Sequence, residues 1–154
     1  MERPFGQVDI RLLDDIFDLN VFAPFLLTQA LRDRINDNGR IINISSVATR
    51  TMTKDQIVYN MSKAAIEMFT KTLAKVMGQR GITVNSVGPG ITSTETVAAR
   101  WTDPAKVRGV EASTLLGRFG EPSDIADFVH ALASPAGRWI TAQTIDASGG
   151  LMFL

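Results

Sequence analysis

The 154-residue sequence contains no cysteine, one histidine and one tyrosine. The lack of cysteine excludes disulfide bonds, thiolate metal sites and a cysteine nucleophile. With His130 as the single histidine, the chain can build neither a histidine-rich metal site nor a Ser-His-Asp triad on another histidine. We therefore expect no metal site, and we interpret His130 as an interface or surface residue.

An excess of charge of one sign and a long apolar run are also missing. Lysine plus arginine and aspartate plus glutamate both number 16, so nothing indicates a nucleic-acid or acidic-membrane surface. The longest apolar stretch, Val21 to Leu27, contains Pro24 and is far shorter than the roughly 20 residues of a membrane span. Glu2 and Arg3 precede no apolar segment, so no signal peptide is predicted. A single cytoplasmic domain, residues 1–154, is the expectation.

Three apolar, β-branched segments predict strands, and three segments with helical periodicity predict helices. The predicted strands are Arg40–Ser45, Ile82–Val87 and Gln143–Ala147; the predicted helices are Leu12–Ile35, Val58–Gln79 and Pro122–Ala133. Val47–Ile57 is expected to be irregular. The segment from Gly90 to about Gly120 is polar and turn-rich, with at most a short helix around Asp103.

Alternation of apolar strands and helices predicts an α/β fold with a parallel sheet and right-handed crossovers. In such sheets the functional groups collect at the carboxyl ends of the strands. Ser46, Pro89-Gly90 and Ser148 all lie at predicted strand ends, so this edge of the sheet is the expected site.

Tyr59 and Lys63 stand four residues apart on a predicted helix, which puts both side chains on one face. A tyrosine has an ordinary pKa of about 10 and is a poor proton donor or acceptor at neutral pH. A neighbouring ammonium favours the phenolate and lowers that pKa. The spacing alone is also compatible with a solvated helix face.

Two further polar residues accompany this pair. Ser46 lies thirteen residues before Tyr59, where a hydroxyl at a strand end can also act as a simple cap. Ser45 is the weaker catalytic candidate, because successive side chains on a strand point to opposite faces. Asn20 is an unusual residue for a helix interior, unless its side chain bonds back to its own helix.

In this order and spacing, Asn20, Ser46, Tyr59, Lys63, Pro89-Gly90 and the closing Gly149-Gly150 resemble the short-chain dehydrogenase/reductase family over essentially the whole chain. The resemblance implies the second half of a Rossmann-like, doubly wound parallel sheet. It also implies hydride exchange between NAD or NADP and a carbonyl or secondary alcohol, with no nucleic-acid or membrane partner.

The resemblance assigns a role to each polar residue of the predicted site. Tyr59 would transfer the proton, and Lys63 would lower its pKa and hold the nicotinamide ribose. Ser46 would hydrogen-bond the substrate oxygen, and Asn20 would support a water that relays protons to Lys63.

The same resemblance assigns the cofactor contacts after the second strand. Pro89 and Gly90 would let the backbone approach the nicotinamide, the Thr92 backbone would meet the carboxamide, and Thr94 would lie near the phosphate. Residues 91–120 would form the substrate lid. A plain strand terminus and a plain surface loop are the alternatives, and Trp101, inside the lid segment, would be a packing residue or a weaker substrate contact.

The sequence departs from the family pattern at the cofactor turn. It contains no Thr-Gly-x-x-x-Gly-x-Gly segment, and the nearest match, Gly88-Pro-Gly90-Ile-Thr-Ser93, lacks the third glycine. The chain, opening at Met1-Glu-Arg-Pro-Phe-Gly, therefore looks like a carboxyl-terminal portion that would be inactive alone. A non-catalytic truncated fragment or interaction subunit is the alternative.

Substrate and assembly are only broadly indicated. The segments Leu116–Ala126 and Asp146–Gly150 are similar to 3-oxoacyl-carrier-protein reductases and equally to sugar, polyol and steroid dehydrogenases. The family's helix and strand interfaces imply a homodimer or homotetramer. The apolar side chains expected at these interfaces are Met68, Phe69, Phe128 and Trp139.

Overall fold

The computed structural model describes residues 3–151, with the side chain of Arg100 excepted, so Met1 and Glu2 of the expected opening loop lie outside it. The strands are β1 Arg40–Ile44, β2 Thr83–Pro89 and β3 Thr144–Ala147. The α-helices are α1 Ile10–Phe17, α2 Ala23–Leu31, α3 Ala48–Thr51, α4 Ile57–Met77, α5 Glu95–Arg100, α6 Pro104–Ser113 and α7 Pro122–Ala133. A π-helix, η2 Asp18–Phe22, joins α1 to α2, and the 3-10 turns are η1 Phe5–Gln7, η3 Lys54–Gln56, η4 Gly78–Arg80 and η5 Pro135–Trp139.

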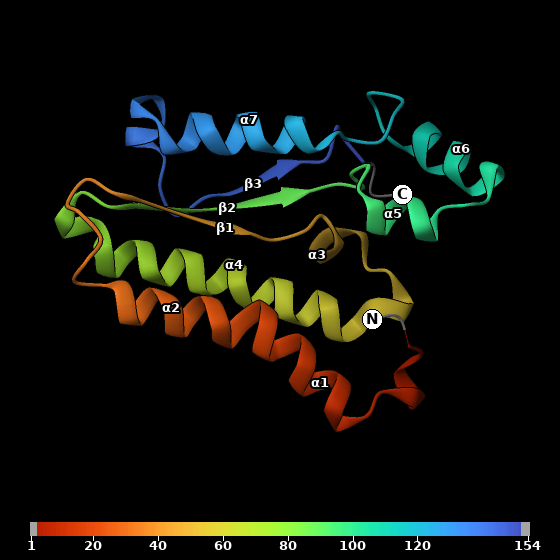
Figure 1. Ribbon diagram of the computed structural model, residues 1–154, viewed down its shortest axis with the longest axis horizontal. Helices are drawn as coiled ribbons and strands as arrows, with labels where there is room; N and C mark the ends of the chain where they lie inside the picture. The colour runs from red at the N-terminus through yellow and green to blue at the C-terminus, as the bar shows by residue number, and fades with distance from the viewer. Residues whose placement is uncertain (1–2, 152–154) are drawn as a thin grey trace.

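The three strands form one parallel sheet in the order β1-β2-β3, as predicted. Helices α1, α2 and α4 lie on one face of this sheet and α7 lies on the other (Figure 1). The arrowheads of the strands, α3, α5 and α6 gather at the same end of the molecule (Figure 1). The topology therefore places all three strand ends beside the segments that follow them.

The core lies between α4 and the sheet. Val84 and Val87 of β2 are completely buried, and Met77 of α4 is 2% exposed. Around them pack Ala74, Ile82, Leu73, Ile35 and Ile41. Burial of such aliphatic side chains stabilises the fold by about 1.5–3 kcal/mol each. The central strand β2 therefore contributes strongly to the stability of the sheet.

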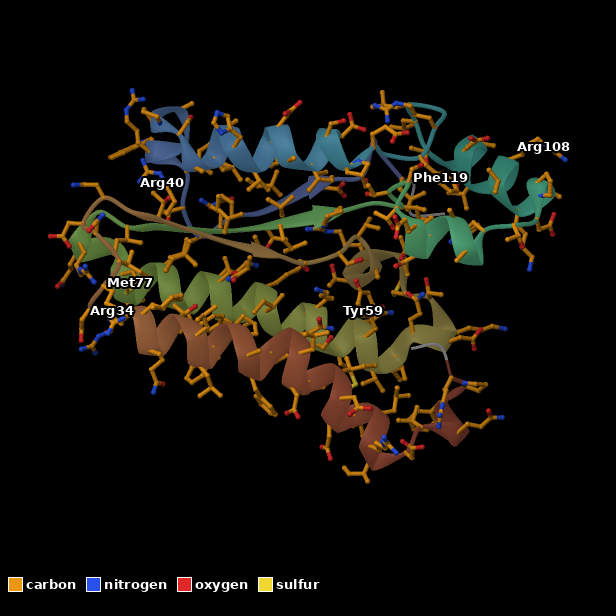
Figure 2. The ribbon with its side chains drawn as sticks, in the orientation of Figure 1. Arg34, Arg40, Tyr59, Met77, Arg108 and Phe119 are labelled. Atoms are coloured by element: carbon orange, nitrogen blue, oxygen red, sulfur yellow. The ribbon has the colours of Figure 1, made fainter. Side chains whose placement is uncertain are left out.

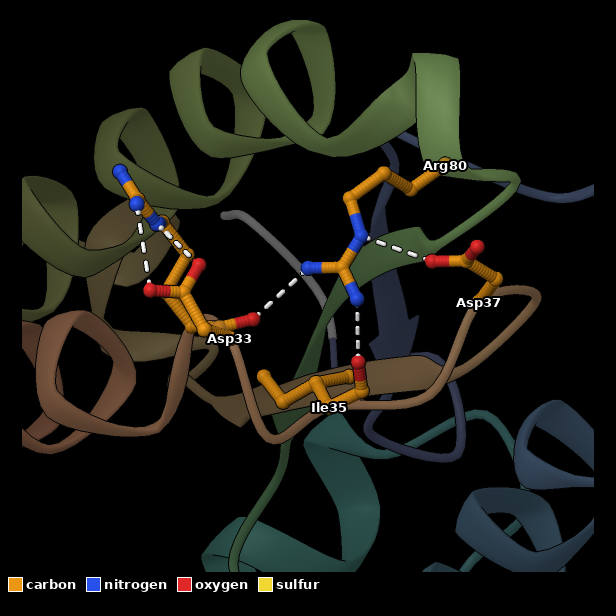
Figure 3. A network of polar contacts seen from close by, with 5 residues as sticks. Asp33, Ile35, Asp37 and Arg80 are labelled. Atoms are coloured by element: carbon orange, nitrogen blue, oxygen red, sulfur yellow. Dashed lines mark hydrogen bonds and ion pairs between the residues drawn. The ribbon is translucent and has the colours of Figure 1, made fainter.

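The end of α2 is secured by a single arginine (Figure 3). The guanidinium of Arg80 donates to the carbonyl of Arg32 over 2.7 Å, to the carbonyl of Ile35, and to Asp37 over 2.8 Å. Carbonyls at a helix carboxyl terminus lack partners within the helix. Arg80, which follows α4, donates hydrogen bonds to carbonyls at and just after this terminus, and thereby holds the end of α2 against α4.

The prediction of one continuous helix over Leu12–Ile35 is wrong. The helix is interrupted by the π-helix η2 and ends at Leu31. Pro24, in the first turn of α2, has no N–H to donate to the carbonyl of Asn20, four residues earlier. The regular ladder therefore cannot continue through this point.

In the segment from Gly90 to Gly120, the helix expected around Asp103 is present as α6, but the expectation that the rest is irregular is wrong, because α5 precedes it. Both helices begin with side-chain caps. Thr94 accepts a hydrogen bond from the amide of Val97, and Asp103 accepts one from the amide of Ala105. Likewise, the predicted irregular segment Val47–Ile57 includes α3 and η3.

Throughout residues 3–151, no helix combines the length and hydropathy needed to cross a membrane.

The start of α7 carries a carboxylate with a displaced pKa. Asp124 accepts a hydrogen bond from Arg118 over 2.7 Å and another from the amide of Glu121 over 2.7 Å. The hydrogen bond from Arg118 first, and that from Glu121 second, lower the pKa of Asp124 from 3.8 to about 2. Both partners favour the ionised carboxylate.

We expect this carboxylate to contribute to acid stability. Because its folded pKa is depressed, its contribution is present above pH 3.8 and is lost as pH falls towards about 2. Asp124→Asn should therefore flatten the dependence of unfolding free energy on pH in that window. Urea denaturation at several pH values measures this, with Asp127→Asn on the same helix as control. An unchanged slope for Asp124→Asn would contradict the assignment.

Candidate active site

The carboxyl ends of the strands are bound to one another by backbone hydrogen bonds. The amide of Val47, just after β1, donates to the carbonyl of Pro89 over 3.0 Å. The amide of Gly90 donates to the carbonyl of Ala147 over 3.3 Å. The segments after β1, β2 and β3 are therefore adjacent, as predicted from the parallel topology.

Tyr59 projects from the first turn of α4 on the side that faces the sheet (Figure 2). The Nζ atom of Lys63 lies 5.6 Å from the centroid of its ring. The same Nζ donates to the carbonyl of Ile44 at the end of β1 over 3.0 Å. Burial lowers the pKa of Lys63 from its ordinary value, because desolvation disfavours the ammonium. The predicted pair is thus assembled, with the ammonium between the phenol ring and the strand end.

Ser46 lies two residues beyond this anchored carbonyl. Its Oγ accepts a hydrogen bond from the amide of Ala48 over 3.1 Å, so the hydroxyl hydrogen is not consumed in that bond. Ser45, in contrast, is 3% exposed, and its Oγ donates to Glu67 over 2.7 Å. The two hydroxyls therefore have different surroundings, as the alternation of strand side chains predicts.

Asn20 lies within the π-helix η2 and bonds across to α4 instead of to its own helix. Its Nδ2 donates to Ser62 Oγ over 3.0 Å, and that hydroxyl donates to the carbonyl of Tyr59 over 2.8 Å. Ser62 is completely buried. Pro24 has no N–H to serve as the α-helical partner of the Asn20 carbonyl. Single π-turns of this kind are frequent at functional sites.

Asn20 is thus joined to the Tyr59 backbone through Ser62, and Lys63 joins the Tyr59 ring to the end of β1, two residues before Ser46. The sequence interpretation did not include Ser62, the π-helix or Glu67. Pro24, four residues after Asn20, was the one signal in the sequence from which the irregular turn could have been inferred.

The predicted cofactor residues lie on the neighbouring strand end. A side chain at Gly90 would place its Cβ 2.8 Å from the Cα of Ser148, so packing alone already requires glycine there. Thr92 donates from its Oγ1 to the carbonyl of Gly90 over 3.2 Å and forms an isolated bridge with Gly120. Thr94 caps α5.

A pocket of about 290 Å³ lies beside these residues. Its lining includes Gly90, Thr92, Leu116, Phe128 and Ser148, but not Ser46, Tyr59 or Lys63. The catalytic candidates therefore lie outside this hollow, on the side of the site where β1 ends.

The catalytic candidates lie beside the outer edge of β1. In the part of the chain that the structure describes, β1 pairs with β2 alone. Thr83 donates to the carbonyl of Gly39, and Ser45 donates to the carbonyl of Val87. In a parallel ladder, the alternate residues Arg40, Ile42 and Ile44 then direct their backbone groups away from β2. Ile44 is 46% exposed, and its carbonyl is the one that Lys63 contacts.

Comparison with known proteins agrees with this arrangement. The family model described as enoyl-(acyl carrier protein) reductase matches residues 1–152. An uncharacterised oxidoreductase of Methylorubrum extorquens is 42% identical over 88% of this chain and 55% of its own length. The 3-oxoacyl-[acyl-carrier-protein] reductase of Synechocystis is 36% identical over 89% of this chain and 55% of its own length.

Solved structures also superimpose closely on this fold. The angucycline C-6 ketoreductase LanV, crystallised with bound NADP, superimposes with a TM-score of 0.91 at 39% identity. The match covers 97% of this chain and 58% of LanV. The chain thus spans little more than half the length of these relatives. The match over residues 1–152, together with the linked Asn, Ser, Tyr and Lys residues, shows that the chain belongs to the short-chain dehydrogenase/reductase family.

Proposed function

We propose that this chain is the catalytic, carboxyl-terminal portion of an oxidoreductase that exchanges a hydride between NAD or NADP and a carbonyl or secondary alcohol. The observation that carries the proposal is the contact of Lys63 with both the Tyr59 ring and the end of β1. It sets an ammonium beside a phenol at the sheet edge where this family of folds places its ligands.

The donors present fit the nicotinamide end of such a cofactor. The ammonium of Lys63 suits ribose hydroxyls, and the backbone and hydroxyls after Pro89 suit a carboxamide and a phosphate. The hydroxyls of Thr92 and Thr94 each have one local bond and retain further hydrogen-bonding capacity. When bound, the nicotinamide supplies the hydride chemistry.

The chain's own residues handle the proton and the substrate oxygen. In the reducing direction, Tyr59 donates its phenolic proton to the carbonyl oxygen, and Lys63 stabilises the phenolate that remains. Ser46 donates a hydrogen bond to the same oxygen and stabilises the charge that develops there. In this proposal, Asn20 supports a water through which Lys63 exchanges protons with solvent.

Residues 91–120 are proposed as the substrate lid. The helices α5 and α6 occupy this segment, and the ring of Trp101 packs edge-on against Phe119 at 5.9 Å. A lid of two short capped helices can move as a unit, which supports gating better than an unstructured loop does.

A second candidate function is that of an interaction subunit without catalytic activity of its own. The unpaired edge of β1 favours it, because an open edge is a template for another strand. Co-purification of a companion polypeptide that carries a glycine-rich cofactor turn would favour the catalytic proposal. A stable homo-oligomer that recruits no such companion would favour the interaction subunit.

In an assembly that turns over, we expect Tyr59→Phe to lower kcat by about a hundred- to ten-thousandfold, as general acid-base catalysis is worth that much. The change removes one hydroxyl and leaves the ring against Lys63. Consumption of NADPH with a carbonyl substrate measures the rate, and circular dichroism confirms that the variant is folded. Turnover within a few-fold of the parent would rule out Tyr59 as the proton donor.

We expect the 154-residue chain alone to bind NADPH weakly. A glycine-rich turn at a helix amino terminus ordinarily holds the pyrophosphate, and the sequence contains none. Hydrogen bonds to such charged groups contribute about 1.5–3 kcal/mol each. Two of them correspond to about a hundredfold or more in affinity. Calorimetry with NADPH and NADH on the purified chain tests this, and a micromolar dissociation constant would contradict it.

We expect the chain to form a homodimer or homotetramer. The outer surface of α4 and the preceding helices exposes several large apolar side chains, namely Leu19, Phe22, Leu26, Met61, Met68 and Val76. A patch of this kind marks an interaction surface. Of the side chains predicted for interfaces, Met68 and Trp139 are 62% and 94% exposed. Phe69 instead packs against Phe25, and Phe128 lines the pocket.

Light scattering tests the oligomer, since a monomer has a mass of 16.8 kDa. Met68→Lys should shift the mass towards that value, because it places a charge in the apolar patch. Lys75→Ala, on the same helix, is the control. A parent chain that is monomeric at working concentration would refute the expectation.

A further inference from the structure

A half-buried carboxylate on α4 holds the segment that carries Ser46. The Oε1 atom of Glu67 accepts a hydrogen bond from Ser45 Oγ over 2.7 Å and another from Thr49 Oγ1 over 2.9 Å. Ser45 directly follows β1, and Thr49 belongs to α3. One oxygen atom therefore joins the helix to both sides of Ser46.

The contacts of Ser46 itself depend on these two neighbours. The amide of Thr49 donates to the Ser46 carbonyl over 3.3 Å, so a shift of Thr49 would also shift the Ser46 backbone. The Ser46 hydroxyl is oriented by the amide of Ala48, next to Thr49, over 3.1 Å. A displacement of Thr49 would move both groups at once.

The chemistry of the acceptor makes this link strong. A carboxylate accepts shorter and stronger hydrogen bonds than a neutral oxygen. The alternative acceptor for Ser45 Oγ is the carbonyl of Lys63 at 3.4 Å, which is a long bond. Loss of the carboxylate would therefore leave a buried hydroxyl poorly satisfied, and the segment would relax to correct this.

Glu67 also follows Lys63 by four residues on α4, so both side chains project from the same face of the helix. Lys63 contacts the carbonyl of Ile44, and Glu67 contacts the hydroxyl of Ser45. Lys63 and Glu67, one turn apart on α4, thus contact the successive residues Ile44 and Ser45.

We propose that Glu67 is a positioning residue that sets the Ser46 hydroxyl for the substrate oxygen. This role rests on the proposed function, because it acts through Ser46. It assigns a purpose to a charged side chain that the proton-transfer chemistry does not use.

Three variants test the role in an assembly that turns over. Glu67→Ala removes the acceptor, Glu67→Gln keeps an acceptor oxygen at the same reach, and Lys71→Ala on the next turn of α4 is the control. We expect Glu67→Ala to lower kcat by about ten- to a hundredfold, a loss typical of a misplaced catalytic group. The KM for NADPH should stay within about twofold, since no cofactor contact changes. Glu67→Gln should restore most of the rate, and Lys71→Ala should match the parent.

A double-mutant cycle separates positioning from general destabilisation. In a Ser46→Ala background, Glu67→Ala should cause little further loss, because its effect passes through the missing hydroxyl. An equal loss in both backgrounds would overturn the proposal, as would a Glu67→Gln variant as slow as Glu67→Ala.

Hydrogen exchange on the 154-residue chain gives a readout that needs no turnover. Glu67→Ala should speed exchange in residues 45–51 and leave residues 70–77 of α4 unchanged, whereas Glu67→Gln should resemble the parent. If Tyr59→Phe leaves turnover intact, the proposed function fails while this exchange result still decides whether Glu67 holds the segment. Unchanged exchange in residues 45–51 would show that it does not.

Discussion

The hydrogen bond from Lys63 to the carbonyl of Ile44 is the contact on which the site depends. It joins the helix that carries Tyr59 to the strand that leads into Ser46. The hydrogen bonds of Glu67 with Ser45 and Thr49 join the same two elements one turn further along α4, but only the Lys63 contact includes a residue of the candidate catalytic set. Because the ammonium is partly desolvated and its pKa is lowered, the carbonyl also compensates for part of the cost of its burial. The same contact therefore serves both the fold and the chemistry.

That carbonyl belongs to the unpaired edge of β1, which connects the site to the question of assembly. The ladder leaves Arg40, Ile42 and Ile44 with backbone groups directed away from β2. A strand added there would bring its own end beside Lys63, directly against the candidate catalytic residues. In the proposed enzyme, covering this edge would therefore also enclose the candidate catalytic residues.

The strands and the main helices could be predicted because β-branched runs, apolar periodicity and turn residues agreed along the chain. Parallel topology sends strand ends to one edge, which accounts for the adjacency of the segments after β1, β2 and β3. The four-residue spacing of Tyr59 and Lys63 accounts for their contact on one face of α4. The π-helix around Asn20 was missed because its cause is a local loss of one donor at Pro24, which periodicity does not register. Helix α5 was missed and α6 was expected only as a short helix, because apolar periodicity is weak in this segment; the caps Thr94 and Asp103 were the better signal.

Glu67 illustrates what a sequence cannot supply alone. Its partners Ser45 and Thr49 lie 22 and 18 residues away along the chain, and a glutamate on a helix ordinarily faces solvent. Only the packing of α4 against the end of β1 turns this residue inward. Gly90 makes the converse point. The cofactor interpretation accounts for a glycine at that position, but a Cβ there would lie 2.8 Å from the Cα of Ser148, which requires glycine whether or not a cofactor binds. A residue can therefore match a functional motif for a reason of packing, and a residue outside every motif can support the catalytic group.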